Sequence, residues 1–335
     1  MPLDPHVRRL LQALSASGPP AAKSPTIAQR RDAFRGLMAF AETGVRVGRI
    51  EDDFLPGPAG LLRYRVYSPS AGAEDILPGL IFFHGGGLVA GNLDTHDPLC
   101  RALCNETGCR LIAVDYRLAP EHPFPAAVQD AYAATVWITR NAWALGLDAE
   151  RIGIVGDSAG GTLAAVVCQL AGTMREARLA LQLLLCPILD WAEETPSRHA
   201  FAEGYLVDRD MMQRDMAWYL PPGTSTWHRH VSPLRANLRG HPPAYIHTAE
   251  CDPLRDEGHA YAERLRAAGV AVHHTCHAGM VHLFYGLGGI VPHARMAHRQ
   301  IGEDIRDAMT GGLRTTHDVC VLPSGSEDLA RDAGA

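Results

Sequence analysis

One serine in the sequence stands in a pattern that nucleophilic catalysis uses. Ser158 is the centre of the segment GDSAG, residues 156–160, which follows the apolar run Ile152–Val155 and precedes a helical run. A G-x-S-x-G pattern between a strand and a helix holds its serine on a tight turn and directs the hydroxyl outward. Glycine is needed at Gly156 and Gly160 because side chains there would collide with the neighbouring strand and helix. We therefore predict that Ser158 is a nucleophile.

A run of three glycines could bind the negative charge that acyl transfer places on oxygen. The apolar residues Leu80–Phe83 are followed by His84, Gly85, Gly86 and Gly87. Backbone amides approach an oxyanion closely where side chains are absent. A phosphate or dinucleotide loop is disfavoured, because neither G-x-G-x-x-G nor G-K-[ST] is present. We expect His84 to orient the loop. The expected oxyanion donors are the amides of Gly85, Gly86 and Ala159.

A serine nucleophile needs a base and a group that orients the base. Asp252 ends an apolar strand and is followed by a proline, which makes it the preferred acid. Glu250, Asp256 and Glu257 compete with it. The last two fall in the first turn of the next helix, where carboxylates are favourable without any catalytic role.

The expected base lies in the loop after the last strand of the core. His282 stands there, beyond a glycine, whereas His273, His274 and His277 lie on or beside that strand. A metal cluster is possible from the number of histidines, but no H-x-x-x-H on a helix supports it. We therefore predict that His282 is the base and that no metal is bound.

The chain contains five motifs whose sequences and order along the chain resemble those of a known family, the hormone-sensitive-lipase-like carboxylesterases of bacteria. The resemblance spans about residues 84–286 and implies that Ser158 is the nucleophile, His282 the base and Asp252 its partner. Asp157, before the serine, resembles one of the two subgroups of the family. Leu283 is a departure, because many members have glycine after the histidine. The motifs are HGGG, DYRLAPEHPFPAAVQD, GDSAGG, AECDPLRDEGHAYAERL and GMVHLF.

Strand and helix patterns alternate along most of the chain, as in a mostly parallel sheet covered on both faces. We therefore predict an α/β-hydrolase fold with an eight-stranded sheet, helices on both faces and a helical cap. The catalytic domain is expected over residues 46–190 and 236–310, with cap helices over 1–45, a cap insertion over 191–235 and a disordered tail over 311–335. The expected strands are Gly48–Phe54, Leu61–Tyr67, Gly79–Phe83, Arg110–Asp115, Arg151–Val155, Leu181–Pro187, Ala244–Ala249 and Ala271–Cys276.

Composition excludes several classes of protein. Of 335 residues, 47% are apolar and 20% are charged, as in ordinary globular proteins, and the net charge of −6 gives no reason to expect nucleic acid as a partner. No apolar run is long enough to cross a membrane. The first residues lack the apolar core of a secretory signal, which predicts a cytoplasmic location. The spacing of Cys100, Cys104 and Cys109 fits a helix and a strand start better than a zinc site.

These features predict a serine carboxylesterase that acts on short- to medium-chain esters of small alcohols or phenols. No cofactor is expected, and the partner is a small ester, with a homodimer possible. The aromatic and methionine-rich cap predicts an apolar pocket that is too short for long acyl chains. Three alternatives stay open: an amidase with the same triad, a non-catalytic ligand receptor on the same fold, and a metallohydrolase that uses the histidine-rich segment.

Overall fold

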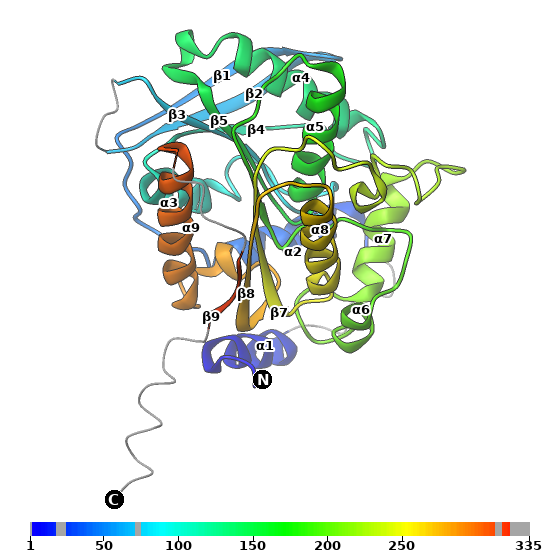
Figure 1. The fold of residues 1–335 in the computed structure, drawn as a ribbon. Helices are drawn as coiled ribbons and strands as arrows, with labels where there is room; N and C mark the ends of the chain where they lie inside the picture. The colour runs from blue at the N-terminus through cyan, green and yellow to red at the C-terminus, as the bar shows by residue number, and fades with distance from the viewer. Residues whose placement is uncertain (1, 18–24, 71–74, 312–316, 322–335) are drawn as a thin grey trace, which may run out of the picture.

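The core of the molecule is one nine-stranded sheet (Figure 1). A computed structural model describes residues 2–17, 25–70, 75–311 and 317–321. The strand order is β1-β2-β4-β3-β5-β6-β7-β8-β9, in which β2 runs antiparallel to both neighbours and all later pairs are parallel. The strands are β1 Arg49–Gly57, β2 Gly60–Ser68, β3 Leu77–Phe83, β4 Arg110–Val114, β5 Leu147–Asp157, β6 Gln182–Leu185, β7 Ala244–Cys251, β8 Val272–Val281 and β9 His317–Val321.

Helices lie on both faces of this sheet, as the alternating pattern predicts. Apolar periodicity predicts two helices within residues 1–45 and four within the core, and all six are present. The four core helices are predicted over Ala126–Asn141, Ser158–Met174, Arg255–Ala268 and His293–Met309. The α-helices are α1 Pro5–Ser17, α2 Ile27–Met38, α3 Asp97–Thr107, α4 Ala126–Arg140, α5 Ala159–Met174, α6 Pro196–Ala200, α7 Arg209–Tyr219, α8 Arg255–Ala267 and α9 His293–Met309. Short 3₁₀ helices are η1 Trp143–Leu145, η2 Pro233–Arg235 and η3 Phe284–Leu287.

The central strand β3 shows why the sheet is buried on both sides. Successive side chains of a strand point to opposite faces. Ile81 and Phe83 belong to the apolar cluster beneath α4, α5 and α8, whereas Leu80 and Phe82 belong to the cluster beneath α3 and α9. All four side chains are fully buried. A continuous apolar strand of this kind is typical of a parallel sheet between two helical layers.

The ninth strand corrects the prediction for the C-terminal segment. A disordered tail was expected over residues 311–335, yet His317–Val321 forms β9 and pairs in parallel with β8. Asp318 accepts hydrogen bonds from Arg266 Nη2 at 2.8 Å and His274 Nδ1 at 3.2 Å. These polar contacts and the strand pairing hold the segment against β8. The sequence did not predict this packing because the segment has few apolar residues. The rest of the predicted tail after Gly311 lies outside the described residues.

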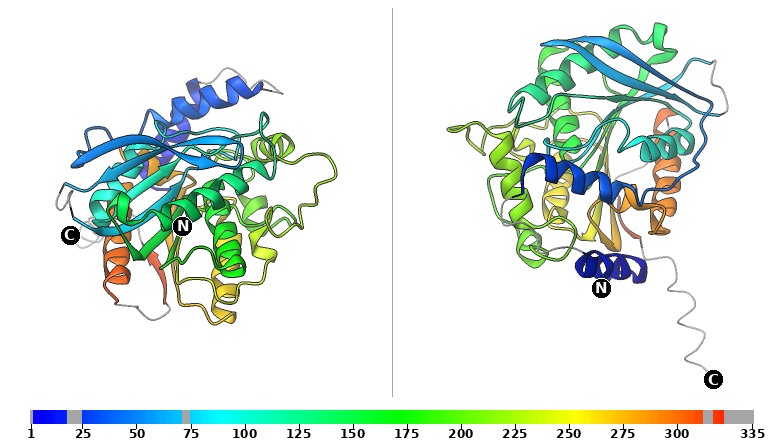
Figure 2. Two further views of the ribbon diagram at one scale, coloured as in Figure 1. Left: turned by 90° about the horizontal axis from the view of Figure 1, so that it is seen from above. Right: turned by 180° about the vertical axis from the view of Figure 1, so that it is seen from behind.

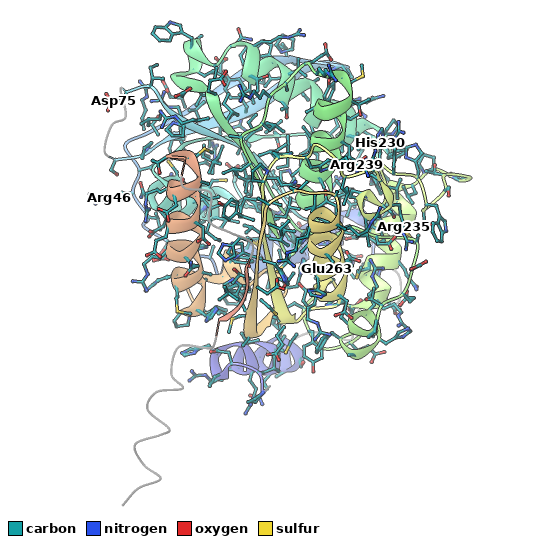
Figure 3. The ribbon with its side chains drawn as sticks, in the orientation of Figure 1. Arg46, Asp75, His230, Arg235, Arg239 and Glu263 are labelled. Atoms are coloured by element: carbon teal, nitrogen blue, oxygen red, sulfur yellow. The ribbon has the colours of Figure 1, made fainter. Side chains whose placement is uncertain are left out.

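Two segments far apart in the sequence lie at the end of the sheet where β5, β7 and β8 finish (Figures 1 and 2). The first contains α1 and α2, and α2 begins with a capping box in which Thr26 and Gln29 bond reciprocally. The second contains α6, α7 and η2, and no strand lies between Leu189 and Gly240, as expected. Arg235, labelled in Figure 3, pairs with Asp190 and Glu193 within the second segment.

Candidate active site

Ser158 lies on the turn between β5 and α5, where the G-x-S-x-G pattern places it. Its backbone has φ 53° and ψ −118°, a strained conformation that residues with a side chain rarely adopt. A Cβ on Gly156 would collide with the carbonyl of Gly160, and a Cβ on Gly160 would collide with the carbonyl of Phe83. The steric reason for the two glycines is therefore visible in the turn itself.

Three predicted side chains meet in one hydrogen-bonded chain at this turn. Ser158 Oγ lies 2.9 Å from His282 Nε2, and His282 Nδ1 lies 2.8 Å from Asp252 Oδ2. With the imidazole protonated on Nδ1, the ring donates to the carboxylate and accepts from the hydroxyl. The serine is 5% exposed and the other two side chains 1% or less. This is the arrangement that activates a serine for attack on a carbonyl carbon.

The position of Asp252 separates it from the competing acids. Asp252 Oδ1 accepts the amide of Leu254 at 2.8 Å, which fixes the carboxylate and aims Oδ2 at the imidazole. Glu250, Asp256 and Glu257 each accept a backbone amide elsewhere, and no bond to His282 joins any of them in the described chain. The three carboxylates therefore serve local structure.

The three other histidines compared with His282 as the base, His273, His274 and His277, lie on β8. His274 Nε2 bonds to the hydroxyl of Thr248 at 3.0 Å. His277 lies between His247 and His293, at 3.1 and 3.0 Å between ring nitrogens. Burial lowers the pKa of His247 to about 3, so this ring is neutral. The rings pack within the core and not in the cavity beside Ser158.

The glycine loop requires a correction to the expected oxyanion donors. The amide of Gly85 donates to Asp157 Oδ1 at 2.9 Å and is therefore engaged. Gly86 and Gly87 line the cavity beside the serine, and within the described residues no acceptor is bonded to their amides. Ala159 begins α5, so its N–H has no acceptor within the helix. The geometry thus favours Gly86, Gly87 and Ala159 in place of the expected set with Gly85.

His84 supports the loop from below, in line with the orienting role expected for it. Its Nδ1 lies 2.8 Å from the carbonyl oxygen of Gly85, and its ring stacks on Tyr116 with 4.3 Å between centroids. Burial lowers the pKa of His84 to about 3, with nearby His96 as a further cause. A neutral ring donates one hydrogen bond to the loop and is a poor base.

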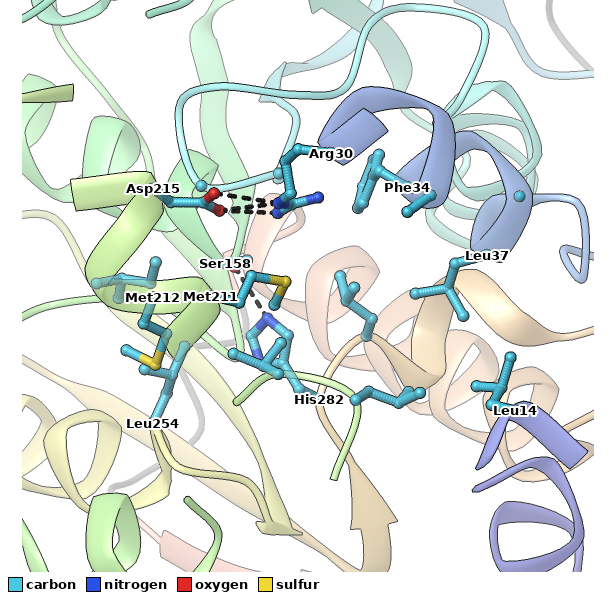
Figure 4. Close-up of a pocket in the computed structure, with 18 of the residues that line it drawn as sticks. Leu14, Arg30, Phe34, Leu37, Ser158, Met211, Met212, Asp215, Leu254 and His282 are labelled. Atoms are coloured by element: carbon cyan, nitrogen blue, oxygen red, sulfur yellow. Dashed lines mark hydrogen bonds and ion pairs between the residues drawn. The ribbon is translucent and has the colours of Figure 1, made fainter. Parts of the chain in front are cut away.

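A cavity of about 400 Å³ opens above the serine (Figure 4). Apart from Ser158 and His282, the polar side chains of its lining are a charged pair, Arg30 and Asp215, that no sequence pattern indicates. Trp191, from the segment expected to form the cap, and Leu283, which follows the base, both line the cavity. Other apolar lining residues are Leu14, Phe34, Leu37, Phe40, Ile188, Leu206, Val207, Met211, Met212 and Leu254.

One group in the described chain could hold a metal ion by proximity alone. Candidate ligand atoms of Cys186, Asp252 and His282 lie within 4.8 Å of one another, all buried. The carboxylate and the imidazole are already hydrogen-bonded to each other, and burial raises the pKa of the Cys186 thiol well above its usual range. A neutral thiol is a poor metal ligand. The group is better explained as the proposed acid and base, with a neutral cysteine packed beside them.

The comparison with known proteins agrees with this geometry. The family model described as the alpha/beta hydrolase fold matches residues 80–286. The chain belongs to the α/β-hydrolase family. The resemblance of this hydrolase to the hormone-sensitive-lipase-like carboxylesterases is thereby confirmed, as is the predicted fold class. No described helix of the hydrolase combines the length and apolar character that a membrane crossing requires.

Relatives of this hydrolase include named esterases. It is 44% identical over 237 residues to carboxylesterase NlhH of Mycobacterium tuberculosis, a match that covers 70% of this chain and 74% of the relative. It is 42% identical over 254 residues to esterase LipI of the same organism, covering 74% and 79%. The solved structure of ester-hydrolase EH1AB1 from the Lake Arreo metagenome is similar, with TM-score 0.89, 39% identity, and 92% and 99% of the two chains covered.

Proposed function

We propose that this hydrolase is a serine carboxylesterase that cleaves short- to medium-chain carboxylic esters through an acyl-enzyme. The observation that carries the proposal is the hydrogen-bonded chain from Ser158 through His282 to Asp252 at the base of an apolar cavity. Relatives that are named carboxylesterase and esterase support the same reaction class. The presence of both acid and base argues against a non-catalytic receptor.

The reaction follows from what each side chain can donate or accept. Ser158 Oγ attacks the ester carbonyl carbon while His282 Nε2 takes its proton. Asp252 holds the imidazole in the required tautomer and stabilises the imidazolium that forms. His282 then protonates the leaving alcohol, and water repeats the two steps on the acyl-enzyme to release the acid.

The tetrahedral intermediates carry negative charge on the former carbonyl oxygen. In the proposed mechanism, the amides of Gly86, Gly87 and Ala159 donate to this oxygen. Fixed donors need no reorganisation as the charge develops, so they stabilise the transition state more than water does. The N-terminus of α5 adds positive potential at the same point.

Hydrolysis of p-nitrophenyl butyrate by the wild type and Ser158→Ala tests the proposal. Removal of the nucleophile should lower kcat/KM by about 10⁴–10⁶ without a change in melting temperature. More than a few per cent of residual activity in a folded variant would show that Ser158 is not the nucleophile. Activity that disappears with a chelator and returns with a metal ion would instead support the metallohydrolase alternative.

Amide hydrolysis is the nearest alternative, because it needs the same triad together with proton delivery to an amine. A p-nitroanilide matched to the best ester separates the two activities, and we expect the ester to be cleaved faster.

We also propose a cytoplasmic location, supported by seven described cysteines that are all free thiols. A homodimer stays a prediction.

A further inference from the structure

A buried ion pair interrupts the apolar wall of the cavity. Arg30 comes from α2 and Asp215 from α7, so the pair joins the two segments that cover the site. Arg30 is 8% exposed and Asp215 3%. Both side chains line the cavity together with Ser158 and His282 (Figure 4). Charged groups placed this deeply are expensive to desolvate, so hydrophobic packing of the cap does not account for them.

The guanidinium of Arg30 uses only part of its donor capacity on the carboxylate. Nε lies 3.1 Å from Asp215 Oδ1, and Nη2 lies 2.8 Å from Oδ2. These bonds leave Nη1, which points away from the carboxylate on the side of Phe34 (Figure 4). No acceptor within the described residues bonds to this nitrogen. An Arg side chain carries five N–H donors in a fixed plane, so Nη1 presents directed donors to the cavity.

The pair stands beside the glycine loop. A Cβ on Gly87 would collide with the Asp215 carboxylate, so that carboxylate rests against the loop whose amides are proposed to bind the oxyanion. Because Arg30 lines the same cavity as Ser158, an ester bound at the serine shares that cavity with Nη1. A hydrogen-bond acceptor close to the ester group of a substrate could reach it.

The charge of the pair indicates which kind of acceptor fits. Asp215 already compensates the positive charge of Arg30, so an anionic substrate group would meet the carboxylate at close range. A neutral ether, ketone or hydroxyl oxygen accepts from Nη1 without that repulsion. Without such an acceptor, the N–H groups lose water on substrate binding and gain nothing in return.

We propose that Arg30 is a specificity-determining residue that selects esters with a second, neutral oxygen close to the scissile carbonyl. This inference rests on the proposed esterase function and names a substrate class for it. Asp215 holds the guanidinium plane and keeps the site electrically neutral. Alkyl esters are cleaved as well, but without this hydrogen bond.

Matched substrates test the role of Arg30. p-Nitrophenyl 3-methoxypropanoate replaces one methylene of p-nitrophenyl pentanoate by oxygen, and 2-methoxyethyl acetate replaces one methylene of butyl acetate in the same way. For each pair, the ratio of kcat/KM for the oxygen ester to kcat/KM for the alkyl ester is measured in the wild type and in Arg30→Met. Comparison of these ratios cancels the intrinsic reactivity of the two esters.

Loss of a hydrogen bond from a charged donor should lower the ratio by about tenfold for at least one pair in Arg30→Met. The control is Arg35→Met, an exposed position on the same helix outside the cavity, which should leave both ratios unchanged. Equal loss on both members of each pair would mean that Arg30 only braces the cap, and would overturn the proposal. If the wild type cleaved none of the esters, the proposed function itself would fail.

Asp215→Asn provides a second test that does not depend on the folding of Arg30→Met. It leaves Arg30 uncompensated, so kcat/KM for p-nitrophenyl hydrogen succinate, a monoanion, should rise by about tenfold relative to the methoxy ester. No change in that preference would contradict the proposed balance of charge. A wild type that already prefers the monoanion would overturn the choice of a neutral acceptor.

Discussion

The carboxylate of Asp157 accepts the amide of Gly85 at 2.9 Å, so the residue before the proposed nucleophile anchors the glycine loop. The same carboxylate lies 3.4 Å from His96 Nε2. Ser158 and the loop are therefore held at a fixed separation by one side chain. Oxyanion stabilisation depends on donors that are in place before the charge develops.

Replacement of Asp157 by alanine should lower kcat by about 10- to 100-fold, less than the roughly 10²–10³ that follows removal of an oxyanion donor itself. The loop keeps its other contacts, which is why the loss is smaller. Asp157→Asn retains an acceptor oxygen and should recover most of the activity. Steady-state kinetics with p-nitrophenyl butyrate measure both variants. Wild-type kcat in Asp157→Ala, or an equal loss in Asp157→Asn, would contradict the anchoring role.

The second prediction concerns the acid. Asp252→Asn should lower kcat by about 10⁴, because an amide in place of the carboxylate favours the wrong imidazole tautomer. Glu250→Gln is the matched control, since Glu250 accepts the amide of Gly279 at 2.8 Å and a glutamine oxygen can still accept it. The control should retain most of its activity. A large loss of activity in Glu250→Gln with nearly normal activity in Asp252→Asn would show that Glu250, and not Asp252, is the acid that orients the base.

A third prediction follows from the neutral, buried ring of His84. Its folded pKa, about 3, lies below its usual value of 6.5, so the unfolded chain binds more protons between these pH values. The stability that this difference contributes is present above pH 6.5 and is lost as pH falls toward 3. The titration of His84 alone changes the free energy of unfolding by at most about 1.4 kcal/mol per pH unit.

His84→Asn, which does not titrate, should therefore lose less stability than the wild type between pH 7.5 and 5.5. The amide can still donate to the carbonyl of Gly85, so the fold of the loop is expected to persist. Urea unfolding at several pH values gives the free energy of unfolding for both proteins. An identical pH dependence would show that His84 does not remain neutral in the folded state.

The fourth prediction is the acyl-chain profile. Each buried methylene contributes about 0.8 kcal/mol, so kcat/KM should rise from acetyl to butyryl or hexanoyl esters. Beyond this length the side chains of Phe34, Leu37 and Leu283 limit the cavity of about 400 Å³. The measurement is kcat/KM over p-nitrophenyl esters of two to sixteen carbons. A maximum at twelve carbons or more, or activation by emulsified lipid, would indicate a lipase.

Local patterns allowed the turn at Ser158 and the positions of the core strands to be predicted. The turn around Ser158 depends on its own glycines, and Asp252 and His282 were chosen because each follows a recognisable strand. The engagement of the Gly85 amide could not be predicted, because it depends on a partner 72 residues away. The same holds for Arg30 and Asp215, which are 185 residues apart and have no motif around them.

The addition of β9 to the sheet has a consequence for how the protein behaves when it is shortened. An unpaired strand offers its main-chain groups to any other chain that can add to it. Removal of the residues after α9 would expose the edge of β8 and take away the contacts of Asp318 with Arg266 and His274. A chain trimmed after α9 would therefore be prone to self-association, so its apparent oligomeric state would reflect the truncation and not the native protein.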